Sequence, residues 1–471
     1  MFMAWTEKKL TAAKLIGSIG LGLLIWILPV PHGLSVIAWR LFSIFIATIV
    51  CIILNPFPMG VITLFALTIA LLTNTIQWSD VCTGFGNDIV WLIVFVFFVA
   101  KVFVSTGLGN RIAYTILKIF GKNSLGLGYG IVATNLIMSP CIPSVTARAG
   151  GVIFPMIKSL ADVFTGPSHD PRMGAFLTLC AYQSMAITSA MFLTAMAGNP
   201  MIAMLAQESS ISISWTDWAV AAIVPGLISL AVLPYFVFRF WPPMVRQTPH
   251  VKEMAREKLR AMGPMSRQEK IITITMVLLI VLWIYGHFIG MKETVAAMLG
   301  VSVLLLTGIL RWKDVLEEQS AWDTLIWFAS LMILASQLNK TGFSSWFSQS
   351  IVGHVEGFHW GWGFVIIILI YFYSHYFFAS AVAHIGAMYV PFLLVAVLIG
   401  TPPQLAALVL AFISNLNVGL THYGSGSAPV LFSGGYVTVR EWWQVGFLFS
   451  LILLFIWIVI GGFWWKFLGY W

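Results

Sequence analysis

Apolar segments long enough to cross a lipid bilayer recur along almost the whole of this sequence. Of its 471 residues, 59% are hydrophobic and 9% are charged, and the mean hydropathy is +0.93. A helix needs about 20 apolar residues to span the hydrocarbon core, and in lipid only helices and closed barrels satisfy every backbone polar group. The sequence therefore predicts an all-α polytopic membrane protein whose helices leave no room for a soluble domain.

The apolar pattern divides the chain into crossings and two pairs of shorter arms. We expect one pair at 125–140 and 145–165, with two prolines between its arms, and a second pair at 359–377 and 381–399. Because proline breaks a helix, the first pair fits a re-entrant hairpin whose tip is buried in protein, and the second pair repeats this pattern. The remaining runs predict eleven crossings, at about 13–30, 34–54, 59–76, 88–108, 173–197, 217–241, 271–290, 293–310, 322–339, 404–423 and 442–467.

Two copies of one helix order account for this pattern. After an N-terminal helix at 1–33, the first copy covers 34–241 and the second covers 271–471, and a basic linker at 242–270 joins them. Each copy holds five crossings and one hairpin, so the second copy enters the membrane upside down. Inverted repeats of this kind are common among secondary transporters, which bind their substrate between the repeats near the membrane midplane.

Positive charges gather in the linker and set the expected orientation. The chain has 25 Lys and Arg against 17 Asp and Glu, for a net charge of +8, and many of the basic residues lie between Arg246 and Lys270. Cytosolic loops of membrane proteins carry the excess of basic residues. We therefore expect the N-terminus and the linker in the cytoplasm and the protein in the cell membrane, and we do not expect nucleic acid as a partner.

A short motif occurs once in each copy, at the expected hairpin tip. The first reads Ser-Val-Thr-Ala-Arg-Ala-Gly-Gly from Ser144, and the second reads Ser-Ala-Val-Ala-His-Ile-Gly-Ala from Ser380. Each carries a basic residue at the same step, Arg148 or His384. A basic group at the bilayer centre costs about 2.5–3.5 kcal/mol on insertion scales, so it marks a functional site. The planar guanidinium of Arg148 suits bidentate contact with a carboxylate.

Two later breaks complete the expected site. One crossing in the first copy ends in Ala-Gly-Asn-Pro, which contains Asn199. The corresponding crossing in the second copy ends in Gly-Ser-Gly-Ser-Ala-Pro, which contains Ser425, Gly426 and Ser427. Glycine and proline end a helix, and the N-termini that follow point their positive dipole ends into the gap. Such ends favour a carboxylate or a phosphate.

Each polar residue also has a structural interpretation. Arg148 would be structural if it paired with backbone carbonyls or with an internal acid, but no Asp or Glu falls in the middle of an expected crossing. His384 would be structural if it bonded a carbonyl, and hydroxyls in membrane helices often bond their own backbone. The matching register of Arg148 and His384 favours a shared role in binding a doubly charged anion.

Enzymes and pumps leave other marks in a sequence. This one has no Walker A motif, no HExxH motif and no nucleophile elbow. Its four cysteines lack metal-ligand spacing, and no acid in mid-crossing offers a proton relay. An intramembrane enzyme with His384 or His422 as a base is the alternative from another class, but it lacks a nucleophile partner. We expect no cofactor and no bound metal.

The sequence resembles the divalent anion/sodium symporter family, in particular its branch of 2-oxoglutarate/malate translocators and citrate/succinate exchangers. The resemblance rests on 139–151, 380–384 and 421–429, and it covers nearly the whole chain. It implies a homodimer in the lipid bilayer, with a scaffold domain and a mobile transport domain in each protomer. It also implies an elevator-type motion of the transport domain.

The sequence departs from this family where sodium is held. Sodium-coupled members carry Ser-Asn-Thr at each tip, whereas these tips read Ser-Val-Thr and Ser-Ala-Val. Valine and alanine offer no oxygen to a hard cation. With Arg148 and His384 as fixed charges, the resemblance implies sodium-independent exchange of dicarboxylates such as 2-oxoglutarate, malate or succinate. The alternative is a sodium-coupled di- or tricarboxylate symporter. The expected binding residues are Ser144, Val145, Thr146, Arg148, Asn199, Ser380, Ala381, His384, Ser425, Gly426 and Ser427.

Overall fold

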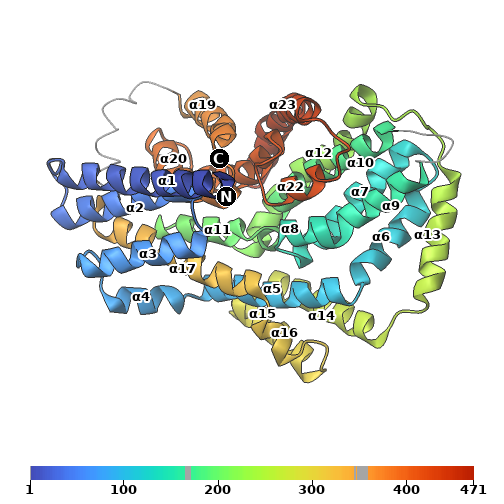
Figure 1. Cartoon of the computed structure of the whole chain (residues 1–471), viewed down its shortest axis with the longest axis horizontal. Helices are drawn as coiled ribbons and strands as arrows, with labels where there is room; N and C mark the ends of the chain where they lie inside the picture. The colour runs from blue at the N-terminus through green and yellow to red at the C-terminus, as the bar shows by residue number, and fades with distance from the viewer. Residues whose placement is uncertain (1, 165–170, 344–345, 347–358) are drawn as a thin grey trace.

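The secondary structure of this chain is built from helices. The computed structural model describes residues 2–164, 171–343, 346 and 359–471, and it contains no β-strand in these ranges (Figure 1). Ten of the described helices are long and apolar enough to cross a membrane, and two shorter apolar helices add to them. The expected fold class, an all-α polytopic membrane protein, is confirmed.

A helix occupies each of the eleven expected crossings in the described part of the chain. These helices are α1 (Phe2–Ile27), α2 (Val36–Leu54), α3 (Met59–Leu72), α5 (Asp88–Ser105), α10 (Pro171–Met191), α12 (Trp215–Phe240), α14 (Arg267–Tyr285), α15 (Glu293–Leu306), α17 (Gln319–Lys340), α21 (Pro403–Leu416) and α23 (Val439–Phe455). The shorter helices between them are α4 (Trp78–Phe85), α6 (Leu108–Phe120), α11 (Gly198–Glu208), α13 (Pro249–Met262), α16 (Trp312–Leu316), α22 (Ser427–Phe432) and α24 (Gly461–Phe467).

The two expected hairpins are helical arms that meet at a break. The first consists of α7 (Ser124–Met138), α8 (Val145–Arg148) and α9 (Phe154–Val163), and the second of α19 (Trp360–Tyr373) and α20 (Ala381–Leu398). Pro140 and Pro143 separate α7 from α8, because neither can donate a backbone hydrogen bond within a continuous helix. The short amphipathic stretch before the second hairpin lies mostly outside the described residues.

Side-chain caps determine where several crossings begin. At α12 and α14, the Ser214 and Ser266 hydroxyl oxygens accept hydrogen bonds from the amides of Asp217 and Glu269, each at 3.1 Å. The two carboxylates accept in return from the serine amides. The same arrangement begins α23. These caps satisfy helix-end donors that lipid cannot satisfy.

Helices of one copy pack on non-equivalent helices of the other copy. Two of these contacts occur twice, with the roles of the two copies swapped. Helix α3 of the first copy lies on α17 of the second, and α15 of the second lies on α5 of the first. At the broken segments α11 lies on α20, and α22 lies on α8. Figure 1 shows α3 beside α17 and α15 beside α5. Two copies related by a two-fold axis produce this exchange; their inverted relation to the membrane stays a prediction.

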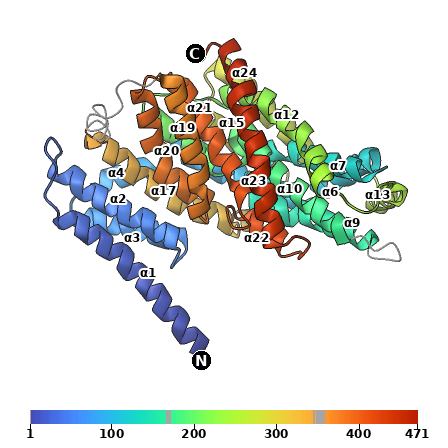
Figure 2. The same cartoon turned by 90° about the horizontal axis from the view of Figure 1, so that it is seen from above.

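Helix α1 stands apart from the bundle. Figure 2 shows it leaning away from the other helices, with the N-terminus at its far end. Its main contact is with α2, and only 11% of its apolar window is buried. Its exposed apolar surface is suited to lipid.

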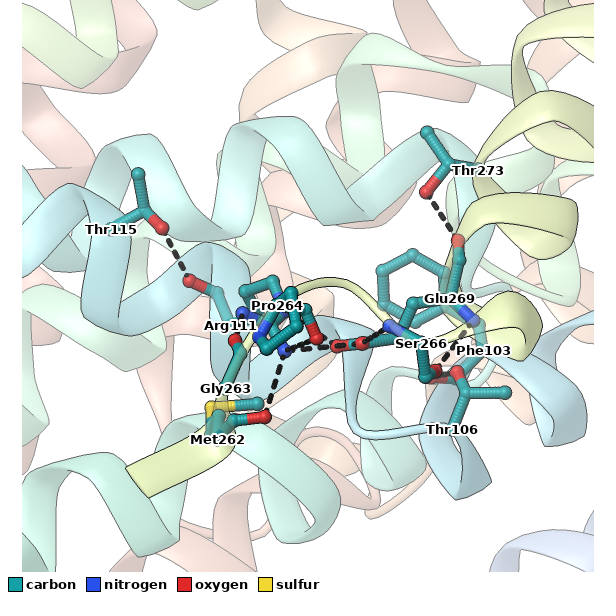
Figure 3. A network of polar contacts seen from close by, with 10 residues as sticks. All are labelled: Phe103, Thr106, Arg111, Thr115, Met262, Gly263, Pro264, Ser266, Glu269 and Thr273. Carbon is teal, nitrogen blue, oxygen red and sulfur yellow. Dashed lines mark hydrogen bonds and ion pairs between the residues drawn. The ribbon is translucent and has the colours of Figure 1, made fainter. Parts of the chain in front are cut away.

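The basic linker contains a helix, α13, that is tied to the first copy. It packs along α6, and Arg111 of α6 points toward the turn between α13 and α14 (Figure 3). Arg111 Nε and Nη2 donate to the two carboxylate oxygens of Glu269 at 2.6 and 3.1 Å, and Nη1 donates to the Gly263 carbonyl at 2.9 Å. The Arg111 and Glu269 side chains are only 14% and 4% exposed. This bidentate pair fixes the linker against α6.

Removing one partner of the pair should destabilise the fold. In Arg111→Met, the Glu269 carboxylate stays buried without its cation, at a cost of about 3 kcal/mol. We expect a lower thermal-unfolding midpoint for the purified protein. Adding Glu269→Gln should restore part of the lost stability because no unpaired charge remains. The glutamine side-chain oxygen can still accept the hydrogen bond from the Ser266 amide. If the double variant loses as much stability as the two single variants added together, the pair is not coupled.

Candidate functional site

The first hairpin tip presents the N-terminus of a helix. The backbone is extended at Ile142 and Ser144, and α8 begins at Val145 and continues through a π-helical turn into α9. The Ser144 hydroxyl oxygen accepts a hydrogen bond from the amide of Ala147 at 3.1 Å. The amides of Val145 and Thr146 have no acceptor within the helix, because the first N–H groups of any helix lack one. The tip therefore offers donors to an anion.

Arg148 is fully buried one turn after this N-terminus. Its Nη2 donates to the Ser189 hydroxyl on α10 at 3.1 Å, whereas Nε and Nη1 have no hydrogen-bond partner. In the described part of the chain it forms no ion pair, and no backbone carbonyl accepts from it. Burying unsatisfied guanidinium donors is costly. The structure therefore does not support a purely structural role for Arg148, because neither an acid nor a backbone carbonyl pairs with it in the described part of the chain. An anion would satisfy its free donors.

The second break lies directly against the first tip. The chain leaves the helical form at Thr421 and begins α22 at Ser427. A Cβ atom added to Gly426 would lie 2.5 Å from Thr146 Oγ1, so any larger residue here would displace the Thr146 side chain. The Ser425 and Ser427 hydroxyl oxygens are 2.9 Å apart. Residues from both copies thus meet at one junction.

A small cavity lies at this junction. Val145 of the tip, Ser425 and Ser427 of the break, and Ser189 of α10 line it, and its volume is about 10 Å³. That is about the space of one water molecule. The cavity is therefore too small for a dicarboxylate in this structure, and its hydroxyl groups come from α10 and from the second break. The other lining residues are Tyr182, Met185, Ala186, Met196 and Val418.

The second hairpin tip repeats the capped N-terminus but keeps its basic residue within the hairpin. The Ser380 hydroxyl accepts from the amide of Ala383 at 3.3 Å. The His384 side chain is fully buried, and its Nε2 lies 2.8 Å from the Ser374 hydroxyl oxygen. Its Nδ1 has no partner. Neither His384 nor Ala381 lines the small cavity.

Contacts of the second tip join it to both breaks. His375 packs edge-on against His384, and its Nε2 lies 3.0 Å from the carbonyl oxygen of Gly424, the residue before Ser425. At the first break, a Cβ added to Gly198 would lie 2.7 Å from Ile385 Cδ1 of the second hairpin. Each tip therefore packs on the break of the other copy.

Asn199 is held within the protein rather than exposed to a cavity. Its Nδ2 donates to the carbonyls of Ser189 and Phe192 at 2.8 and 3.0 Å, and its Oδ1 accepts from Asn415 at 2.8 Å. These bonds link α10, α11 and α21. Asn199 therefore positions the segment that carries Ser189, the partner of Arg148.

Tyr182 and Ser189 were not predicted from the sequence. They lie seven residues apart on one face of α10, and the Tyr182 hydroxyl donates to the Val418 carbonyl at 2.7 Å. The available signal was the spacing of polar residues along one face of an apolar crossing. That signal is weak, because hydroxyls in membrane helices often bond their own backbone.

Comparisons with known proteins cover nearly the whole chain. Residues 9–471 match the family model described as the sodium:sulfate symporter transmembrane region. The chain is 50% identical over 465 residues to Dicarboxylate transporter 1, chloroplastic, of Arabidopsis thaliana, which covers 97% of this chain and 83% of that protein. It is 50% identical over 470 residues to the putative malate transporter YflS of Bacillus subtilis strain 168, which covers 98% of both chains.

A solved structure supports the fold. The crystal structure of the Alcanivorax borkumensis YdaH transporter matches with a TM-score of 0.58 and 12% sequence identity, and the match covers 83% of this chain and 88% of that one. At this identity the likeness shows the fold alone. The family model and the two relatives match this chain in sequence over nearly its whole length. This chain therefore belongs to the divalent anion/sodium symporter family, a family of membrane transporters.

Proposed function

We propose that this protein exchanges dicarboxylates across the cell membrane without sodium. The observation that carries the proposal is the buried guanidinium of Arg148, whose Nε and Nη1 lack a partner and whose Nη2 bonds Ser189 in the wall of the small cavity. The relatives, a chloroplastic dicarboxylate transporter and a putative malate transporter, supply the substrate class. Candidate substrates are 2-oxoglutarate, malate and succinate.

The two carboxylates bind at opposite sides of the junction in this proposal. One takes hydrogen bonds from Arg148, from the Ser189 hydroxyl and from the free amides at the first tip. The other meets the Ser425 and Ser427 hydroxyls at the N-terminus of α22. Three hydroxyls and a guanidinium give charge-assisted bonds that a neutral solute cannot match. The cavity of about 10 Å³ has to open for a substrate to enter.

The second tip influences this site without lining its cavity. His375 bonds the Gly424 carbonyl, and His384 packs against His375 without lining the cavity. A protonated His384 would therefore attract the second carboxylate through space rather than by contact. Two charges that are not in contact can still interact strongly in the low-dielectric interior of a protein.

Fixed charge explains why transport is an exchange. When the substrate leaves, Arg148 remains as an uncompensated cation, and moving it through the membrane costs about 3 kcal/mol. That cost slows the return of the empty carrier by roughly a hundredfold. A bound dianion compensates Arg148 together with a protonated His384, so the loaded site carries no net charge. The loaded carrier therefore crosses in both directions, and the empty carrier seldom does.

Movement of one helix group against another would open the site. We propose that α7–α11 and α19–α22 move together, since α21 packs on both α10 and α20, and α11 packs on α20. Helices α2, α3, α5, α14, α15 and α17 form the stationary group and the contact between two protomers of a homodimer. This is an elevator-type motion of the two inverted repeats.

Sodium-coupled symport is the second candidate. The family model that matches this chain describes sodium:sulfate symporters, and the first tip keeps two hydroxyls, Ser144 and Thr146. Against it, Val145, Ala381 and Val382 provide no side-chain oxygen where a sodium ion would need several. A flux experiment separates the two candidates.

Uptake of labelled malate into malate-loaded proteoliposomes should not depend on sodium. We expect initial rates within about twofold of each other in sodium and in choline buffers, because the protein's own cations take the place of the ion. Empty vesicles without protein are the control for leakage. A sodium gradient that raises uptake by tenfold or more would establish symport instead.

The Arg148→Lys variant should bind dicarboxylates about tenfold to a hundredfold more weakly, because lysine cannot offer the planar pair of donors and a charged hydrogen bond is worth about 1.5–3 kcal/mol. Calorimetric titration of purified protein with malate measures the change. The matched control is Arg440→Lys, at an exposed position on α23, which should bind normally. Unchanged affinity in Arg148→Lys would mean that Arg148 does not contact the substrate.

A further inference from the structure

A second, larger cavity lies away from the candidate functional site. It has a volume of about 260 Å³ and is enclosed by α2, α11, α17 and α20. Its walls are mainly apolar and include the buried side chains of Met201, Leu205, Leu331 and Leu338. Among the described residues, no Lys, Arg or His lines it. A dicarboxylate would find no cation there, so the cavity belongs to a different class of ligand.

Acceptor groups gather at one end of this cavity. Glu208, which lines it, is the last residue of α11 and forms no ion pair with any described residue. The negative end of the helix dipole disfavours a carboxylate at this position, so a cation would stabilise it. Asn339 also lines the cavity and donates its Nδ2 to the Glu208 carbonyl at 2.8 Å. Its remaining polar atom is an oxygen acceptor.

A proline adds a further acceptor in the same wall. Pro391 lies within α20 and has no N–H, so it cannot donate to the carbonyl of Ala387 one turn earlier. Both residues line the cavity. The Ala387 carbonyl in this wall therefore lacks its usual helical donor.

Aromatic rings complete the surroundings. Phe42 of α2 stacks on Phe343, with ring centroids 4.4 Å apart, and both line the cavity together with Phe45. The stacked faces of Phe42 and Phe343 cover each other, and Trp39 also stacks on Phe42. Phe45 is therefore the lining ring left to attract an organic ammonium ion. This ring, the acceptors and the carboxylate thus favour the same kind of ligand group.

We propose that this cavity binds an amphiphile with an apolar body and a cationic ammonium head. The ammonium group has three donors and no acceptor, which matches a lining that supplies a carboxylate, carbonyls and a ring face. The apolar body fills the space between Leu205, Leu331 and Leu338. The ligand would touch α2 and α17 on one side and α11 and α20 on the other. This site is independent of which anion the protein transports.

A pair of probes that differ only in the head group tests the proposal. 4-Phenylbutylammonium carries the charge, and 4-phenylbutanol is its neutral counterpart. Their binding to purified protein in a neutral detergent is measured by equilibrium dialysis. The variants are Glu208→Gln and, as the matched control, Glu257→Gln, which changes an exposed glutamate on α13. Ala335→Phe fills the cavity from α17. Thermal unfolding of each variant confirms that it is folded.

The proposal predicts saturable binding of the ammonium probe to the native protein. Glu208→Gln should weaken that binding at least tenfold and leave binding of the alcohol within twofold, whereas Glu257→Gln should change neither. Ala335→Phe should abolish binding of both probes. Equal binding of the ammonium probe to native protein and to Glu208→Gln, native affinity in Ala335→Phe, or no saturable binding at all would overturn the proposal.

Discussion

A guanidinium buried in an apolar bundle is the constraint on which this structure depends. Lipid supplies no hydrogen bonds, so the broken helices that hold Arg148 have to be enclosed by protein. The fold meets this requirement by packing the first tip on Gly426 and the second tip on Gly198. Ser189 of α10 takes one donor of Arg148, and two remain free. The free donors require a negatively charged ligand. They also make the empty site costly in free energy.

Much of this architecture could be predicted because it follows from local chemistry. Hydropathy located the crossings, and Pro140 and Pro143 located the first hairpin tip, since neither effect needs knowledge of distant residues. The motif at the first tip placed Val145 in the expected site, and the later helix break placed Ser425 and Ser427 there; the structure brings these three to one cavity. Their role in binding the substrate stays a proposal.

The rest depended on side-chain directions that no local rule provides. The shared register set His384 equivalent to Arg148, yet His384 bonds Ser374 of its own hairpin while Arg148 reaches α10. Which neighbour a buried side chain contacts is decided by the packing of helices far apart in sequence. Asn199 was expected to offer donors to the substrate, but its Nδ2 donates to two backbone carbonyls of the protein.

We propose that Arg148, a buried cation of the protein itself, replaces sodium. It also makes the outward movement of one substrate depend on the inward movement of another. The most direct measurement follows labelled malate leaving preloaded proteoliposomes after dilution into buffer with or without external malate. We expect efflux to be at least about tenfold faster when malate is present outside, because the empty carrier returns slowly. Equally fast efflux into malate-free buffer would contradict the account.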